Sequence, residues 1–593
     1  MYHQRVLFIV IYLYLICALN QHADSLLLSA QKEVTMIIGL DVGGTHTDVV
    51  LLGPKGVIHE AKFPTNKQNL FESVWQGIQA VIDDIEVKEI KRAVLSTTLT
   101  TNLVVENKTA PAGLIVSSGP GIDPQLFRMG DEYHMVSGSI DHRGREIQRI
   151  NKQEISAVAD HLEKAGIRQV GIVGKFSTRN PIHEKQIAEI IQNRFDIIIQ
   201  GHQLSGVLNF PRRIATTYIN AAVYPQNQLF LESINKSFKE HGLNVPIYTL
   251  KADAGTMNLQ ASLMQPGQTI LSGPAASVMG AIPYTQENTD TLVLDIGGTT
   301  TDMAIVVNRV PLLDPIGIEL AGYKTLIRSL KTHSIGLGGD SVVRFNDGTI
   351  TVGPDRHGPA MAFGGSEPTP TDAMFVLDDP IEGGDKELAI KGFEKLSQKM
   401  NVSLKAAAQK VLKVACEKIL SEANHMVERI NSQPVYTVHE ILQGKQVHPT
   451  DILALGGPAP FFSKRLEALT SKHVRVAPKW GVANAIGAAL ARTTCQVSLF
   501  ADTEQGYLTV PENNYQEKIN RNFTNDDALN TATRLLKEKA IETGASAEDL
   551  EIETIENTQF NMIRGFYTTG KNIRVKVQVK PGLIRSYSKI MTH

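Results

Sequence analysis

Residues 41–48 read Asp-Val-Gly-Gly-Thr-His-Thr-Asp, and residues 295–302 read Asp-Ile-Gly-Gly-Thr-Thr-Thr-Asp. An apolar run precedes each copy, at 36–40 and 292–294, and another follows it. This pattern predicts two β-hairpins, each with a tight glycine turn and an aspartate at the end of its first strand. A single glycine turn of this kind is common and usually structural. Because the fixed letters recur in two distant segments, we interpret the pair as a duplicated functional element.

The chemistry of such turns suits phosphate groups. Paired glycines let the backbone turn sharply and approach a bulky anion, and successive N–H groups in the turn form an anion-binding nest. Threonine hydroxyls add hydrogen-bond donors, and an aspartate can hold hydrated Mg²⁺ against phosphate. Two copies therefore predict two phosphate clamps that face each other, with a nucleotide between two similar domains.

A third element has the same character. Residues 451–460 read Asp-Ile-Leu-Ala-Leu-Gly-Gly-Pro-Ala-Pro, which predicts a buried strand ending in Gly456-Gly457, and a helical pattern follows over 461–470. In the superfamily of actin, sugar kinases and Hsp70, such a strand, glycine pair and helix pack the adenosine. The chain resembles that superfamily in the order of its phosphate 1, phosphate 2 and adenosine motifs.

Within that superfamily, the chain resembles the hydantoinase A / 5-oxoprolinase family. Four further segments carry the resemblance in the family's order: 96–102, similar to HGTTxxTN; 271–281, similar to LSGPAAGVxGA; 332–341, similar to HTIGAGGGS; and 365–373, similar to GGTEPTVTDA. The likeness extends, with gaps, from Met36 to about Thr494. Leu95 and Ser96 stand where the family has His-Gly. If that histidine contacts substrate in the family, this chain handles a different substrate or none.

The resemblance implies an α/β fold in which duplicated actin-like (ribonuclease H-like) ATPase domains flank a nucleotide cleft, with a small α/β domain at the C-terminus. We expect an N-terminal actin-like domain with an insertion at 36–250. A second actin-like domain, with the phosphate 2 and adenosine motifs, is expected at 251–498, and the C-terminal domain at 499–593.

Residues 1–35 precede the first expected strand. Residues 6–19 form an apolar run behind Arg5 that is typical of a signal peptide, but no convincing A-x-A cleavage site follows. We expect that the start codon is wrongly placed upstream of Met36, with export as the alternative.

Composition is typical of a multidomain enzyme. At 593 residues the chain is too long for a single core, and its apolar (42%) and charged (20%) fractions are ordinary. A net charge of −2 gives no reason to expect nucleic acid or a membrane surface as a partner. Three cysteines without metal-type spacing make a disulfide framework or a zinc finger unexpected. We therefore expect a cytoplasmic protein.

Several helices follow from apolar periodicity. The pattern predicts helices over 70–84, 403–430 and 527–543, and a longer one over 211–242 that is interrupted at Pro225. Cys416 lies inside one of them and is expected to be inert packing.

The resemblance also implies roles for individual residues. Asp41 and Asp295 are assigned to Mg²⁺ and to catalysis, directly or through water. Asp48 and Asp302 are expected to orient the hairpins. The residues expected to bind ATP are Gly43, Gly44, Thr45, Thr47, Gly297, Gly298, Thr299 and Thr301 at the phosphates, with Gly456 and Gly457 at the adenosine.

Two further catalytic candidates carry alternatives. His333 occupies the family's histidine position, and it either lines the active site or is a structural histidine. Asp340 replaces a glycine of the following turn, so it is either an extra carboxylate near phosphate or a helix N-cap.

Other segments are candidates for substrate or metal binding. The long loops 117–146 and 353–372 are expected to set specificity, with a plain surface excursion as the alternative for the second. His134, Asp141 and His142 offer metal ligands, but their spacing matches no strong metal pattern.

The resemblance implies ATP-dependent activation of a small carbonyl compound. In ring-opening members the amide oxygen is thought to attack the γ-phosphate, and water then attacks the activated carbon. We therefore expect an ATP-dependent hydrolase of a small cyclic amide, hydantoin or 5-oxoproline-like. This chain would act alone or as the ATP-binding subunit of a two-subunit enzyme.

Three alternatives stay open. One is a subunit of an ATP-dependent ketone carboxylase, and another is a small-molecule kinase of the same fold. The third is a nucleotide-gated binding protein that does not hydrolyse ATP. We expect an oligomer and a hydantoinase B-type partner subunit, because some family members act only with one.

Overall fold

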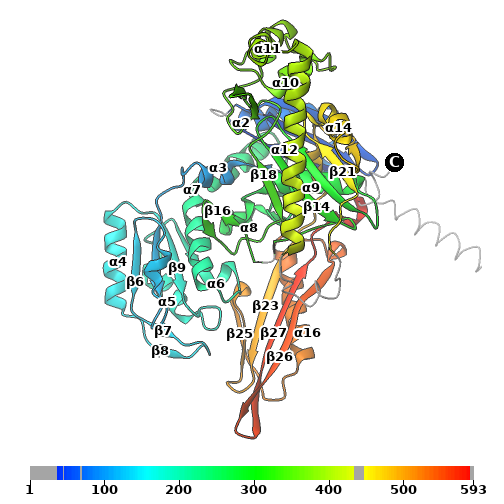
Figure 1. Ribbon diagram of the computed structural model, residues 1–593. Coiled ribbons are helices and arrows are strands. Elements are labelled where there is room, and N and C mark those ends of the chain that lie inside the picture. Colours follow the sequence, from blue (N-terminus) through cyan, green and yellow to red (C-terminus); the bar gives the residue numbers. More distant parts are fainter. Residues whose placement is uncertain (1–35, 45, 67–69, 315, 433–445, 588–593) are drawn as a thin grey trace, which may run out of the picture.

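The computed structural model describes residues 36–44, 46–66, 70–314, 316–432 and 446–587, and its fold is α/β with mixed sheets (Figure 1). Residues 1–35, expected to be a misplaced start or a signal-like segment, lie outside the described residues, as does Thr45. None of the helices in the described part of the chain is long and apolar enough to span a bilayer.

The first sheet has six strands in the order β12-β11-β4-β1-β2-β3. Antiparallel pairing joins β1 to β2 and β2 to β3, whereas β4 and β11 run parallel to β1. Every residue of β1 is buried, as its continuous apolar run predicts. The strands are β1 (Met36–Val42), β2 (His46–Gly53), β3 (Gly56–Pro64), β4 (Ile90–Thr97), β11 (Ile247–Leu250) and β12 (Thr256–Asn258).

A later sheet repeats this arrangement. Its order is β15-β14-β13-β21-β22, again with an antiparallel hairpin on one side of the first strand and two parallel strands on the other. An additional strand, β18, pairs with β14. The strands are β13 (Asp290–Ile296), β14 (Thr301–Val307), β15 (Val310–Pro311), β18 (Thr332–Ile335), β21 (Asp451–Leu455) and β22 (His473–Val476). Both predicted glycine hairpins are confirmed by this pairing.

Two helices lie between the sheets and join them in one core. Helix α9 (Ser272–Ala281) packs against α15 (Ala483–Leu490) so closely that a Cβ on Gly487 would lie 2.0 Å from the carbonyl oxygen of Ala276. Only glycine permits this backbone contact. The surrounding apolar cluster takes Ile37 and Val50 from the first sheet and Val293 from the second.

An insertion interrupts the first sheet between β4 and β11. It forms its own four-stranded parallel sheet, in the order β10-β9-β5-β6, on the left of Figure 1. A small hairpin, β7 and β8, follows β6. The elements are β5 (Gly113–Ser117), β6 (Tyr133–Val136), β7 (Ser139–Ile140), β8 (Glu146–Gln148), α4 (Lys152–Lys164), β9 (Gln169–Gly174), α5 (Ile182–Ile191), β10 (Ile197–Gln200) and α6 (Gly201–Leu204).

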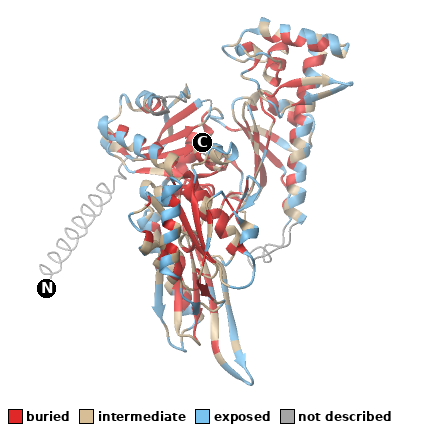
Figure 2. Cartoon of the chain, turned by 90° about the vertical axis from the view of Figure 1, so that its left-hand side faces the viewer, coloured by how far each residue is buried: buried red, intermediate tan, exposed pale blue. Residues whose placement is uncertain are grey.

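The C-terminal part is a five-stranded antiparallel sheet in the order β25-β24-β23-β27-β26, covered by α16 (Asn525–Glu542). Its first strand begins at Gln496, before the expected boundary at 499. Buried residues follow the inner strands, whereas the ends of the longest strands are exposed (Figure 2). The strands are β23 (Gln496–Asp502), β24 (Tyr507–Val510), β25 (Tyr515–Lys518), β26 (Ile552–Arg564) and β27 (Tyr567–Val579).

Helices cover the sheets elsewhere. The predicted break at Pro225 is wrong: α7 (Phe210–Glu240) continues through this proline. The lost backbone hydrogen bond is offset because α7 buries Phe230 and Phe238 beyond the proline.

The other helices are α2 (Leu70–Ile82), α3 (Leu99–Val105), α8 (Leu259–Met264), α10 (Pro370–Val376), α11 (Lys386–Met400), α12 (Leu404–Ser432) and α14 (Ala459–Glu467).

Cys416 is buried in α12, where burial raises the pKa of its thiol to about 12. The predicted packing position is confirmed by this burial, and the raised pKa disfavours the reactive thiolate form.

Candidate active site

The first glycine hairpin places its polar groups at the tip between β1 and β2. Asp41 lies opposite Asp48 in the strand register. The turn is closed by the Gly43 N–H, which donates to the carbonyl oxygen of His46 at 3.0 Å. Gly44 is exposed, and a Cβ placed on it would meet nothing within 4 Å. The tip therefore leaves space for a bulky group.

The second hairpin repeats this geometry between β13 and β14. Asp295 lies opposite Asp302, and the Gly297 N–H donates to the carbonyl oxygen of Thr300 at 2.9 Å. Thr299 is exposed at the tip. The same turn, with the same closing hydrogen bond, thus occurs at equivalent points of two equivalent sheets.

Not every threonine of these turns faces outward. Thr47 is buried, and its Oγ1 lies 3.0 Å from Oγ1 of Thr65. The Thr301 hydroxyl donates to the carbonyl oxygen of Leu337 at 2.7 Å. The structure therefore uses both hydroxyls to brace the hairpins, and among the described residues Thr299 is left exposed at the tip of the second hairpin.

The acidic residues of the two hairpins meet at helix α15. The amide Nδ2 of Asn484 donates to Asp41 Oδ2 at 3.2 Å and to Asp295 Oδ2 at 3.4 Å. The hydroxyl of Ser277, on α9, donates to the same oxygen of Asp295 at 2.5 Å. The two helices that join the sheets thus also hold the two predicted metal ligands together.

Burial makes this group of carboxylates electrostatically strained. Burial and the charge of Asp48 raise the pKa of Asp41 to about 7, and burial and the charge of Asp295 raise the pKa of Asp302 to about 7. Burial also raises the pKa of Asp295 and of Asp48. At Asp48 the ammonium of Lys62, 2.6 Å from Oδ1, opposes that shift.

A bound cation would relieve this strain. Asp41 Oδ1 is buried and has no hydrogen-bond partner, so one ligand oxygen is left over for an ion. Carboxylate oxygens are the ligands that Mg²⁺ prefers. The donor set around Asp41 and Asp295 therefore fits Mg²⁺.

The predicted adenosine element lies beside the second hairpin. Gly456 follows β21 with a φ of +93°, and a Cβ there would lie 2.3 Å from the carbonyl oxygen of Ile296 and 2.6 Å from Asp295 Oδ1. Gly457, by contrast, faces open space. The following helix, α14, begins at Ala459, slightly earlier than predicted.

Asp340 lies against the second hairpin. Its N–H donates to the carbonyl oxygen of Gly298 at 2.7 Å, and its Oδ2 accepts from Arg356 Nη2 at 2.8 Å. Arg356 Nη1 also donates to Thr299 Oγ1 at 2.7 Å. The N-cap alternative for Asp340 is wrong, because the next element is a strand, β19 (Val343–Asn346). Asp340 is a carboxylate at the second glycine turn, paired with an arginine.

His333 lies apart from this group. It pairs with Met303 in the register of β18 and β14, whereas its neighbour Ser334 pairs with Asp302. Successive residues of a strand point to opposite faces. His333 therefore points away from the carboxylates, and its Nε2 lies 3.2 Å from Oε2 of Glu422 on α12. The structure supports the structural alternative for this histidine.

Two segments that carry the family resemblance contact each other. The hydroxyl of Ser272 donates to the carbonyl oxygen of Thr97 at 2.9 Å. The Thr97 N–H in turn donates to the hydroxyl oxygen of Ser272 at 3.2 Å. The Leu271 N–H donates to Thr101 Oγ1 at 2.8 Å. The threonine-rich segment thus lies at the start of α9, next to the first hairpin, where the Thr98 N–H reaches the carbonyl oxygen of Val42 at 3.3 Å.

The loop 353–372 is anchored more firmly than a surface excursion. Thr369 caps α10 in a capping box with Asp372, whose carboxylate also accepts from the N–H groups of Met361 and Ala362. The Thr371 hydroxyl donates to the carbonyl oxygen of Gly339, in the turn that carries Asp340. The loop therefore positions Arg356 at the second hairpin.

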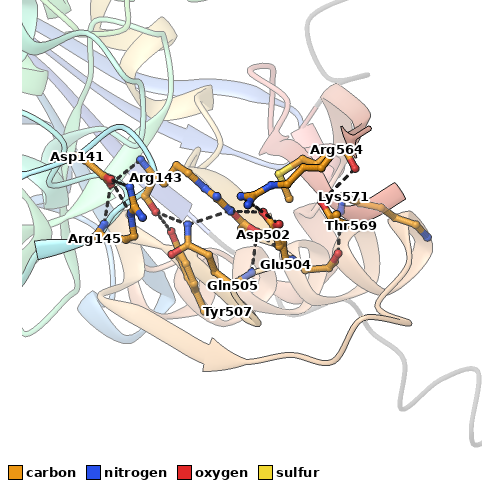
Figure 3. A network of polar contacts seen from close by, with 12 residues as sticks. Asp141, Arg143, Arg145, Asp502, Glu504, Gln505, Tyr507, Arg564, Thr569 and Lys571 are labelled. Carbon is orange, nitrogen blue, oxygen red and sulfur yellow. Dashed lines mark hydrogen bonds and ion pairs between the residues drawn. The ribbon is translucent and has the colours of Figure 1, made fainter. Parts of the chain in front are cut away.

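The loop 117–146 ends in a contact with the C-terminal sheet (Figure 3). Arg143 donates to Glu504 at 2.6 Å and to Asp502 at 3.2 Å, and its carbonyl oxygen accepts from the hydroxyl of Tyr507 at 2.7 Å. Asp141 accepts from the N–H groups of Arg143 and Arg145 and so closes the turn. This end of the loop joins two parts of the molecule.

The metal alternative for His134, Asp141 and His142 finds no support in this arrangement, because Asp141 is occupied in its turn. His142 is exposed. His134 instead lies beside Glu132.

Sequence reasoning missed four residues of the site. Ser277 and Arg356 lie inside segments that carry the family resemblance or form the long loop, but nothing in the sequence distinguishes them from their neighbours. Lys62 is one of several polar residues on an exposed strand. Asn484 has no local signal, since its role depends on two aspartates from distant segments.

Comparisons with known proteins agree with the motifs. Residues 213–497 match the hydantoinase/oxoprolinase family, and residues 37–195 match the hydantoinase/oxoprolinase N-terminal region. Caprolactamase subunit alpha of Pseudomonas jessenii is 22% identical, over 74% of this chain and 68% of its own. The acetophenone carboxylase gamma subunit of Aromatoleum aromaticum is 23% identical, over 89% of this chain and 77% of its own.

The 5-oxoprolinase of Saccharomyces cerevisiae is 23% identical over 57% of this chain, which spans only 31% of that protein. Among solved structures, nucleotide-free acetone carboxylase has a TM-score of 0.68 at 16% identity, covering 94% of this chain and 88% of its own. The ATP-dependent caprolactamase from Pseudomonas jessenii has a TM-score of 0.68 at 18% identity, covering 91% of this chain and 87% of its own. At these identities the two structures show similarity of fold, over 94% and 91% of this chain.

Proposed function

Because the chain belongs to the hydantoinase/oxoprolinase family, we propose that it is an ATP-dependent hydrolase of a small cyclic amide, hydantoin or 5-oxoproline-like. The observation that carries this proposal is the pair of matching hairpins whose aspartates, Asp41 and Asp295, share the amide of Asn484. We propose further that the two equivalent sheets are actin-like halves with ATP between them. The matching strand orders and turns support that reading.

Each part of the nucleotide has candidate contacts. The exposed turns at Gly44 and Thr299 would bind the phosphates through backbone N–H groups. The open face of Gly457 would lie against the adenosine. Gly43, Gly297, Gly298 and Gly456 would shape these contacts by allowing close approach of the backbone.

Asp41 and Asp295 would hold Mg²⁺, which supplies charge neutralisation for phosphoryl transfer from ATP when both are bound. Arg356 would stabilise negative charge at the second turn, and Asp340 would position its guanidinium. Ser277 and Asn484 would orient the Asp295 carboxylate. His333 is left out of this set because it points to the other face of its strand.

A partner subunit is part of the proposal. Caprolactamase subunit alpha and the acetophenone carboxylase gamma subunit are, by name, parts of larger enzymes. We propose that this chain likewise supplies the ATP site and that a hydantoinase B-type subunit completes the substrate site.

A second candidate is a subunit of an ATP-dependent ketone carboxylase. The acetophenone carboxylase gamma subunit matches 89% of this chain, more than the caprolactamase relative does. The two candidates share ATP and Mg²⁺ and differ in whether bicarbonate is consumed.

The test is phosphate release from Mg·ATP by the chain beginning at Met36, with hydantoins, 5-oxoproline, lactams or simple ketones, the last with and without bicarbonate. Free phosphate together with an opened ring supports the hydrolase. Ketone-stimulated release that requires bicarbonate supports the carboxylase instead. A phosphorylated product without free phosphate identifies a kinase, and both main candidates are then wrong.

The same panel is repeated with a co-expressed B-type subunit. Nucleotide binding with no stimulated phosphate release under either condition would contradict the enzymatic proposal and support a nucleotide-gated binding role.

A further inference from the structure

Three metal-ligating side chains converge on the insertion, outside the proposed ATP site. Nε2 of His134 lies 2.8 Å from Oε2 of Glu132, and Nε2 of His161 lies 3.0 Å from the same oxygen. One ligand atom from each residue lies within 4.8 Å of the other two. The two imidazole rings stand edge to face with their centroids 5.1 Å apart.

The fold explains why they meet. Glu132 immediately precedes β6 and His134 is its second residue, and residues two apart along extended backbone point to the same side. His161 comes from the last turn of α4, which packs beside β6 on the left of Figure 1. Because β6 is the edge strand of its sheet, the group lies at the border of the insertion.

The spacing suits a single small ion. Ligand atoms on a tetrahedral Zn²⁺ with bonds of about 2.0–2.1 Å lie about 3.4 Å apart. The two separations from Glu132 Oε2 are slightly shorter, so small side-chain rotations would open the group enough to admit an ion.

The chemistry of the group favours zinc over magnesium. Imidazole nitrogen suits Zn²⁺ and its transition-metal neighbours, whereas Mg²⁺ prefers oxygen ligands alone. Two histidines and one carboxylate form a three-ligand set that leaves a coordination position open to water. The side chain of His161 is 58% exposed, which gives an ion access from solution.

We propose that Glu132, His134 and His161 bind one Zn²⁺ ion that ties the edge of the insertion sheet to α4. The site differs from the Mg²⁺ site in its ligands, in its sheet and in the class of metal. It does not depend on the proposed function.

The experiment uses the full chain, stripped with a chelator and held in excess Mg²⁺ so that carboxylate sites are occupied. Zn²⁺ binding is measured by calorimetry, and Co²⁺ binding by its visible absorption. We expect one Zn²⁺ per chain, a Co²⁺ spectrum of low coordination number, and a higher Tm with Zn²⁺.

Two variants test the ligands. His161→Gln removes an exposed ligand on a helix surface and should weaken Zn²⁺ binding at least about tenfold. Glu132→Gln keeps an acceptor oxygen for the histidines but loses the negative charge, so it should fold normally and also bind more weakly. His142→Gln, at an exposed histidine in the turn that follows β7, is the matched control and should bind like the parent chain.

The proposal is overturned if the parent chain binds no Zn²⁺ at micromolar concentration, which would identify the group as a hydrogen-bonded triad only. It is equally overturned if His161→Gln and Glu132→Gln bind Zn²⁺ as tightly as the parent, because the ion would then reside elsewhere. Loss of the Zn²⁺-dependent rise in Tm in both variants, but not in His142→Gln, supports it.

Discussion

Asp41 and Asp295 end equivalent strands of two different sheets, yet one amide nitrogen, Nδ2 of Asn484, lies 3.2 Å from the first carboxylate and 3.4 Å from the second. The amide belongs to α15, whose backbone touches α9 through Gly487. The separation of the carboxylates is therefore set by the packing of these two helices.

Asn484→Ala should reduce ATP hydrolysis about tenfold or more, because both carboxylates lose their shared donor. The free energy of unfolding without Mg²⁺ should fall by about 1–3 kcal/mol, the cost of unsatisfied buried groups. Phosphate release and chemical denaturation measure the two effects. Asn346→Ala, at an exposed position, is the control, and equal behaviour of the two variants would contradict the role of Asn484.

Asp295→Asn should abolish ATP hydrolysis and leave the fold intact, since the amide preserves size and removes the charge that would hold Mg²⁺. We expect at least about a hundredfold loss of kcat. Asp347→Asn, at an exposed turn, controls for the same chemical change. Unchanged turnover in Asp295→Asn would rule out its assignment to the metal.

Arg356→Ala should lower kcat for ATP hydrolysis by about tenfold to a hundredfold, because its guanidinium is the positive group at the second turn. KM for ATP should change less than kcat if charge develops during transfer. Arg344→Ala removes a neighbouring arginine whose partner is Asp355 and should leave both constants unchanged. A loss of equal size in both variants would indicate a general effect on the loop.

The carboxylate cluster should make stability fall as pH rises in the absence of Mg²⁺. The pKa of Asp302 is about 7 in the folded state against an ordinary 3.8. The folded protein therefore keeps a proton that the unfolded chain loses between about pH 4 and pH 7, which costs about 1.4 kcal/mol per pH unit. Asp302→Asn should reduce this slope but not abolish it, because Asp41 has a similarly raised pKa.

Denaturation curves at several pH values measure the slope, and Asp347→Asn should retain it. Mg²⁺ should reduce the slope in the parent chain, because metal binding favours ionised ligands. The same slope in the parent and in Asp302→Asn would show that this carboxyl group ionises normally.

Arg143→Ala should loosen the insertion from the C-terminal sheet. The side chain donates to Glu504 and to Asp502, and Asp502 is almost fully buried. We expect a loss of about 2 kcal/mol in stability and faster proteolysis between the two parts. Arg145→Ala, in the same turn but 60% exposed, should have a smaller effect. If the two variants behave alike, the contact contributes little.

The local elements could be predicted because each has a complete signal in adjacent residues. The glycine hairpins are bounded by apolar runs, and α12 has regular apolar spacing, so both were predicted close to their observed positions. The boundary between the two main sheets was harder to predict. Strand β12 belongs to the first sheet, although it begins at Thr256, beyond the expected end of the first domain at 250. A three-residue strand is too short to show a period.

The site was also predictable only in part, because only some of its residues carry a signal in the adjacent sequence. Asp41 and Asp295 carry a duplicated motif, whereas Asn484 and Arg356 are defined by contacts with distant segments. For His333 the family resemblance offered a catalytic role, with a structural role as the alternative. The register of β18 turns its side chain toward Glu422, away from the carboxylates. Strand register depends on pairing between segments and is not written in a single run of residues.

The position of residues 583–587 also affects how the protein folds during its synthesis. Leu583, Ile584 and Tyr587 leave the C-terminal sheet and return to the core between the two main sheets, where they share a cluster with Ile37 of the first strand. The Ile584 N–H donates to the carbonyl oxygen of Leu490 at the end of α15. During synthesis the central core therefore lacks part of its apolar surface until residues 583–587 have left the ribosome. Such long-range closure slows folding and prolongs exposure of the unfinished core, so we expect the nascent protein to depend on chaperones.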